Sequence, residues 1–99
     1  MTMIEVLRAA EQAVTARGAA YGPAGEVHAT AAKIWSAILG IEVTTLQVIL
    51  CLDGVKTARL AHAPTHADGP TDKAGYAAMY GEVAEGVERE RERRSQGGG

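Results

Sequence analysis

The chain has 99 residues and a net charge of −2, with 46% hydrophobic and 22% charged residues. That length accommodates one domain and leaves little room for a second core. The composition is that of a soluble globular protein, and the charge gives no general affinity for nucleic acid. No apolar run approaches the roughly 20 residues of a membrane span, and the N-terminus has no signal-peptide pattern. We therefore expect a cytoplasmic protein without membrane or bulk nucleic-acid partners.

The first half of the chain predicts two helices. Thr2 and Glu5 form a capping box ahead of apolar residues at helical spacing, so the first helix should span about residues 3–17. Pro23 suits the first turn of a second helix, which should end at Gly40. The second helix carries an apolar stripe that is expected to face the core: Val27, Ala31, Ile34, Trp35 and Ile38.

A second capping box predicts a third helix. Thr44-x-x-Gln47 marks its start, and the helix should cover about residues 45–62, with a proline soon afterwards. Residues 46–52 are the most apolar run in the chain, so this part of the helix is expected to be buried. Cys51 lies within it, which predicts a buried, reduced thiol rather than a disulfide.

A fourth helix should begin at Asp68 or Thr71 and bury a face that includes Tyr76. From Glu88 the charges alternate in sign, which predicts a solvated helical extension that ends in a disordered glycine tail. No segment shows strand-like alternation, so the predicted fold is all-α. It is a four-helix bundle-like domain over residues 1–87, followed by the extension over 88–99. Alanine-rich helices bury little area each, so a homo-oligomer is expected.

Five charged residues gather around the junction of the third and fourth helices: Asp53, Lys56, Arg59, Asp68 and Asp72. In one interpretation they satisfy each other, with Asp53 paired to Lys56 and Arg59 paired to Asp68 or Asp72. In the other, Lys56 and Arg59 bind the phosphate or carboxylate of a ligand, and the aspartates orient these cations.

Three further residues are candidates for the same site. Arg17 either compensates the dipole at the end of the first helix or completes a pocket wall with Tyr21, whose ring would stack on a base. Tyr76 follows Asp72 by one turn, and core packing is its alternative role.

The sequence does not predict a metal site or a catalytic residue. His62 and His66 have zinc-like spacing, but Pro64 between them argues against the helix that such a pair needs. Asp68 and Asp72 would require further oxygen ligands for Mg²⁺, and the nearest pair, Glu82-x-x-Glu85, lies more than two turns away. No cofactor is expected, although Mg²⁺ would be required for hydrolysis of a nucleotide.

The motifs resemble, in their order, those of a family of short, largely uncharacterised phage and prophage proteins, over roughly residues 5–80. Lys73 departs from the pattern, because that family usually has an apolar residue there. The motifs that carry the resemblance are Arg17-x₃-Tyr21-Gly22-Pro23, Trp35, Lys56-x₂-Arg59, Asp68-x₃-Asp72 and Gly75-Tyr76.

A more distant resemblance is to the all-α nucleoside triphosphate pyrophosphohydrolases. Their Mg²⁺ is held by a Glu-Glu-x-x-Glu helix and a Glu-x-x-Asp helix. The present chain lacks both motifs and has only Glu26 and Asp53 in the corresponding helices. The resemblance therefore implies ligand binding more than hydrolysis.

Three functions are expected from these features. The first is binding, without turnover, of a nucleotide or nucleotide-derived signalling ligand, which a phage protein would sequester. Its site residues would be Arg17, Tyr21, Lys56, Arg59, Asp68, Asp72 and Tyr76. The second is a Mg²⁺-dependent pyrophosphohydrolase that uses Asp68, Asp72, Glu82 and Glu85. The third is a structural or interaction module, in which the charges only fix the third helix against the fourth.

Overall fold

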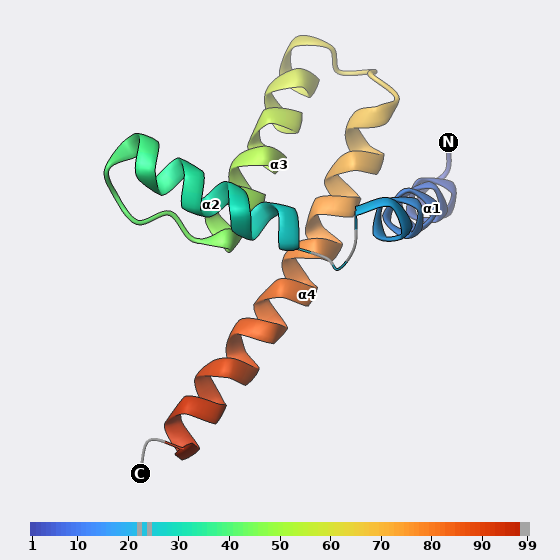
Figure 1. Ribbon diagram of the computed structural model, residues 1–99. Coiled ribbons are helices and arrows are strands. Elements are labelled where there is room, and N and C mark those ends of the chain that lie inside the picture. Colours follow the sequence, from blue (N-terminus) through green and yellow to red (C-terminus); the bar gives the residue numbers. More distant parts are fainter. Residues whose placement is uncertain (22, 24, 98–99) are drawn as a thin grey trace.

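The computed structural model describes residues 1–21, 23 and 25–97, apart from the side chains of residues 19–21. Within these residues all the regular structure is helical, which confirms the all-α prediction (Figure 1). No helix among them is both long and apolar enough to cross a membrane. The four helices are α1 (Met3–Tyr21), α2 (Glu26–Leu39), α3 (Thr45–His62) and α4 (Asp68–Gly97).

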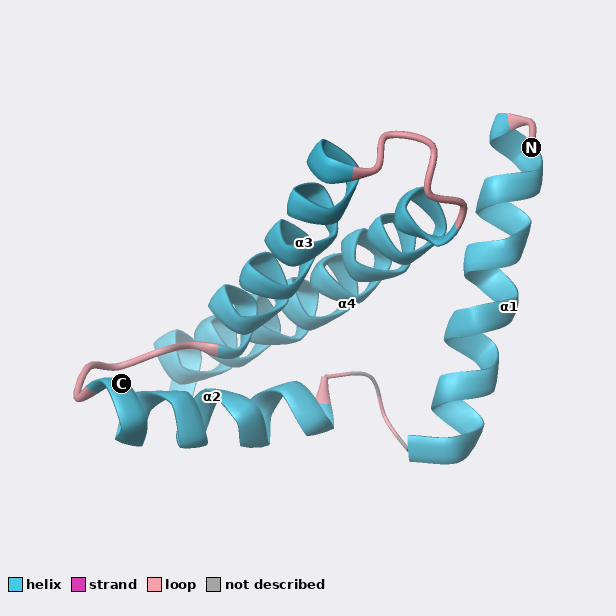
Figure 2. Cartoon of the chain, turned by 90° about the horizontal axis from the view of Figure 1, so that it is seen from above, coloured by secondary structure: helices cyan, strands magenta, loops and turns pink. Residues whose placement is uncertain are grey.

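Helix α4 is the centre of the arrangement. It packs against α3 on one side and α1 on the other, and α2 packs against α3. The two views agree that α1 lies apart from α3, across α4 (Figures 1 and 2). The last turns of α4 project beyond the other helices, and α4 passes residue 87 without a break. Residues 98–99 of the predicted glycine tail lie outside the described part of the chain.

Both predicted capping boxes are present. The Thr2 hydroxyl accepts from the Glu5 N–H at 3.1 Å, and the Glu5 carboxylate accepts from the Thr2 N–H at 3.1 Å. Thr44 and Gln47 make the same reciprocal pair, at 3.2 and 2.9 Å. Each box satisfies two N–H groups that a helix start leaves without partners, which is why these two starts could be predicted to the residue.

The junction between α1 and α2 differs from the prediction. Helix α1 continues to Tyr21, past the expected end at residue 17, and α2 begins at Glu26 rather than at Pro23. The N-cap of α2 is Gly25, which has a φ of 82° and lies against α4. A Cβ on Gly25 would come within 2.6 Å of Val83 Cγ2, so both the backbone angle and the contact require glycine here.

The start of α4 follows the first prediction. Asp68 is its first residue, and Pro70 is accommodated in the first turn, where its missing N–H has no helical partner in any case. Close approach of α3 and α4 depends on Gly69, which is buried. A Cβ there would lie 2.7 Å from Leu60 Cδ2.

The hydrophobic core is small. Among the described residues its buried apolar members are Ala10, Ala32, Val48 and Ile49, of which only Val48 and Ile49 are fully buried. The prediction that the apolar stripe of α2 faces the core is wrong, because Val27, Ile34 and Ile38 are 57%, 54% and 74% exposed. Helix α2 packs against α3, and its buried residue is Ala32, with Trp35 half-buried.

Helix α3 also buries only part of its apolar run. Val48 and Ile49 are buried, whereas Leu50 is 55% exposed and Cys51 is exposed. The prediction of a buried thiol is therefore wrong. An apolar run of seven residues covers the whole circumference of a helix, and the neighbours of α3 cover only one side of it.

Candidate functional site

The charged residues of α3 and α4 form two ion pairs that cross between the helices. Lys56 Nζ lies 2.8 Å from Asp72 Oδ2, and both side chains are about four-fifths buried. Lys73 Nζ lies 3.0 Å from Asp53 Oδ1 and also 3.0 Å from Oδ2. These four residues are called the α3–α4 ion-pair pattern below.

The pairing follows from the antiparallel packing of the two helices. Asp53 of α3 meets Lys73 of α4. Further along α3, Lys56 meets Asp72 and Leu60 meets Gly69, so the partners on α4 come progressively earlier in the chain. The acid precedes the base on both helices, and because the helices run antiparallel, each charge meets its opposite. The predicted pairing of Asp53 with Lys56 is wrong, because both side chains are used across the interface.

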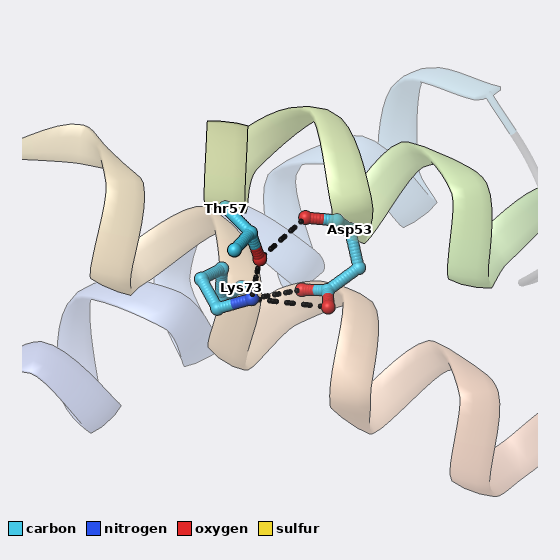
Figure 3. Close-up of polar contacts among 3 residues, drawn as sticks. All are labelled: Asp53, Thr57 and Lys73. Atoms are coloured by element: carbon cyan, nitrogen blue, oxygen red, sulfur yellow. Dashed lines mark hydrogen bonds and ion pairs between the residues drawn. The ribbon is translucent and has the colours of Figure 1, made fainter. Parts of the chain in front are cut away.

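Thr57 completes the group around Lys73. Its hydroxyl accepts from Lys73 Nζ at 2.7 Å and donates to the Asp53 backbone carbonyl at 3.3 Å (Figure 3). The ammonium of Lys73 therefore has three acceptor atoms on α3. Thr57 was not among the predicted site residues, although its position one turn after Asp53 places it on the same side of the helix.

Lys73 has a defined partner on α3. An apolar residue at that position would leave the half-buried Asp53 carboxylate without its cation. Lys73 and Asp53 thus form a matched pair, and the lysine is engaged in that pair rather than free to bind a ligand.

The other predicted site residues lie apart from this pattern. Arg59 is exposed and makes no ion pair with any described residue, so the expected pairs with Asp68 and Asp72 are absent from that part of the chain. Asp68 is also exposed at the start of α4, whereas Tyr76 is half-buried one turn after Asp72.

Arg59 borders a shallow, open depression of about 380 Å³ at the end of α3. The depression is mostly apolar, but the guanidinium of Arg59 and the imidazoles of His62 and His66 share its surface. Its lining residues are Val55, Ala58, Arg59, His62, Ala63 and His66.

Arg17 is associated with a different group. It lies near His28 at the start of α2. The pKa of the His28 imidazole is lowered mainly by burial and also by the charge of Arg17. The buried Nδ1 atom of His28 has no hydrogen-bond partner among the described residues. The side chain of Tyr21 lies outside the described part, so its predicted stacking role stays a prediction.

The acidic residues considered for Mg²⁺ are not brought together. Asp72 pairs with Lys56, and Glu85 pairs with Arg89 at 3.1 Å. No group of three or more His, Cys, Asp or Glu side chains lies close enough to hold a metal ion in the part of the chain that is described.

A comparison with known families matches residues 5–84 to a domain of unknown function, DUF6378. The chain belongs to the DUF6378 family. The matched range contains the whole α3–α4 ion-pair pattern and ends inside α4, before its last turns. No curated protein and no solved structure matches the DUF6378 chain.

Proposed function

We propose that this DUF6378 protein is a helical interaction module that works as an oligomer of identical chains. The observation that carries the proposal is the size of its exposed surface. The chain exposes 7228 Å², whereas a compact monomer of its mass exposes about 5,400 Å². The excess of about 1,800 Å² exceeds the 800 Å² or so that one partner contributes to a standard protein interface.

The shape of the chain accounts for this surface. Its radius of gyration is 15.6 Å, against about 13 Å for a compact domain of this length. The polar end of α4 contributes part of the excess, but much of the rest is aliphatic and lies on the other three helices. Its members are Ile4 and Leu7 on α1, Val27, Ile34 and Ile38 on α2, and Leu50 and Val55 on α3.

Burial of such residues would add the stability that the small core lacks. Complete burial of one Leu, Ile or Val side chain contributes about 1.5–3 kcal/mol, so several half-exposed ones represent a stabilisation comparable to that of a whole small domain. Association with a second copy is a direct way to obtain it, because most soluble oligomers are built from identical chains.

The α3–α4 ion-pair pattern fits a structural role in such a module. Both lysines are paired across the helix interface, which is the arrangement expected if these charges hold α3 against α4. Chemical denaturation at several protein concentrations tests the proposal. If unfolding is coupled to dissociation, the midpoint rises with concentration. A midpoint that stays constant over a hundredfold range would contradict it.

A second candidate function is the binding of an anionic, nucleotide-like ligand without turnover. One observation favours it: Arg59 has no acidic partner among the described residues and shares an apolar depression with His62 and His66. A phage or prophage origin and a host cytoplasmic location belong to this candidate through the resemblance of the sequence motifs.

Isothermal titration with a panel of nucleotides, cyclic forms included, tests the second candidate. Binding that disappears in Arg59→Met while the unfolding temperature stays the same would support it. Absence of binding to every member by the folded protein would remove it.

A further inference from the structure

Helix α2 has two apolar faces, and only one of them is covered. Helix α2 packs against α3, and its covered face contains Ala32, which is 6% exposed. Ser36, on the same side, donates to the Ala32 carbonyl at 2.7 Å and accepts from the Val43 N–H at 2.8 Å, which ties the following loop to the helix. Because each helical residue advances by about 100°, Ile34 and Ile38 lie roughly opposite Ala32. Their exposure of 54% and 74% agrees with that position.

The uncovered face has the spacing of a coiled-coil seam. Its residues recur at intervals of four, three and four. No charged residue occurs among them, and the flanking exposed positions, Thr30 and Ala37, are also uncharged. These residues are called the α2 seam: Val27, Ala31, Ile34 and Ile38.

We propose that the α2 seam is an interface with the α2 seam of a second copy of this chain, packed antiparallel. The inference rests on the self-association proposed above and assigns it to one face. The exposed polar residues Glu26, Thr30 and Lys33 lie on another side of α2, at i, i+4 and i+7, so the α2 seam is an apolar face distinct from the polar one.

The antiparallel direction follows from side-chain size and from the helix dipoles. With the two-fold axis between residues 32 and 33, small Ala31 lies opposite Ile34 of the partner copy, and Val27 lies opposite Ile38. Alternation of small and large residues allows the two surfaces to interdigitate, whereas a parallel pair would place Ala31 against Ala31. The antiparallel arrangement also sets each helix N-terminus near the partner's C-terminus, so the dipoles attract.

Other occupants fit the face less well. A helix that lies on a lipid surface needs basic residues beside its apolar face, and α2 has one lysine in a chain of net charge −2. A charge-free, self-complementary strip is instead the composition found at the centre of protein interfaces.

The test compares Ile34→Glu with Val87→Glu by sedimentation equilibrium, with circular dichroism to confirm the helical fold. Val87 is a matched control for Ile34, since the two are 51% and 54% exposed and Val87 lies on α4, outside the aliphatic surface of α1, α2 and α3. We expect Ile34→Glu to be monomeric at concentrations where the wild type and Val87→Glu are dimeric, with at least a tenfold weaker association.

Disulfide cross-linking tests the orientation in a Cys51→Ser background, which also serves if Ile34→Glu fails to fold. Val27→Cys and Ile38→Cys chains should cross-link with each other when mixed, and far less with themselves. Self-linking of each variant alone would overturn the antiparallel arrangement.

The remaining outcomes separate the two proposals. A monomeric wild type would remove both the self-association and the α2 seam interface. A dimer that survives Ile34→Glu would overturn the α2 seam alone. Binding of anionic vesicles through Ile34 by a monomeric wild type would overturn both proposals and assign the face to lipid.

Discussion

At the scale of single residues, the ion pairs assign different roles to cations that look alike in the sequence. Lys56 lies largely buried against Asp72, whereas Arg59, one turn later on α3, is exposed. A charge that is paired and largely removed from water is costly to leave alone, but an exposed one is not. The two residues should therefore respond differently to the same substitution.

Lys56→Met should lower the free energy of unfolding by about 1–2 kcal/mol, because it leaves the Asp72 carboxylate unpaired in a mostly buried position. Arg59→Met should change it by less than about 0.5 kcal/mol. Urea denaturation of both variants gives the comparison. Equal losses in the two variants would contradict the assignment of Lys56 to the helix interface.

His28 should make stability depend on pH. Burial lowers the pKa of its imidazole in the folded chain, and Arg17 lowers it further, whereas the unfolded chain has the ordinary value of about 6.5. The unfolded state therefore binds the proton more readily. The stability that comes from neutral His28 is complete above about pH 6.5 and is lost as the pH falls through the lowered pKa.

The measurement is the free energy of unfolding from pH 7.5 to 5, compared between wild type and His28→Gln. Groups common to both chains cancel in the difference, so the wild type should lose more stability than the variant as the pH falls. Parallel curves for the two chains would show that His28 does not contribute.

At the scale of helices, the contact of α3 with α4 depends on a residue without a side chain. Gly69 is buried against Leu60, whereas Gly54, also within a helix, has no atom within 4 Å of the place a Cβ would take. Replacing each glycine by alanine therefore separates two effects: the gain from helix propensity, which applies at Gly54, and the loss from close packing, which applies at Gly69.

Gly54→Ala should stabilise the protein by about 0.5–1 kcal/mol, because alanine restricts the unfolded chain and favours the helix. Gly69→Ala should instead destabilise it by about 1–3 kcal/mol, since the new methyl group would overlap Leu60. Thermal unfolding of the two variants reveals the sign of each effect. A gain in stability for Gly69→Ala would contradict the close approach described here.

The helices themselves could be predicted well where local chemistry determines them. The capping box at Thr44 and Gln47 gives the start of α3, and Gly40, with a φ of 71°, gives the end of α2. The start of α2 could not be predicted, because Gly25 is selected by contact with Val83, a residue 58 positions away. Pro23 favours a helix start by local preference, but the contact of Gly25 with Val83 places the start at Glu26 instead.

The site was predictable in its members but not in its pairing. The sequence shows that charges of both signs gather near the junction of α3 and α4. It does not show which face of α3 meets α4, and this decides that Asp53 pairs with Lys73 instead of Lys56. For the same reason the apolar stripe of α2 could be recognised, while its exposed position could not.

At the scale of the whole molecule, a small core and a large aliphatic surface occur together. Four buried apolar residues among those described are few for a domain of this length, and the exposed side chains could supply a second core between copies. The ion-pair pattern fixes α3 on α4, so the surfaces presented to a partner would be held by a defined helix pair.

The most direct test of this account is the mass of the wild-type protein at sedimentation equilibrium over a wide concentration range. We predict a mass of at least twice 10.3 kDa at high concentration, which falls toward 10.3 kDa on dilution or remains constant if association is tight. A mass of 10.3 kDa at every concentration, in protein shown to be helical and folded, would contradict the claim that this chain works as an assembly of identical copies.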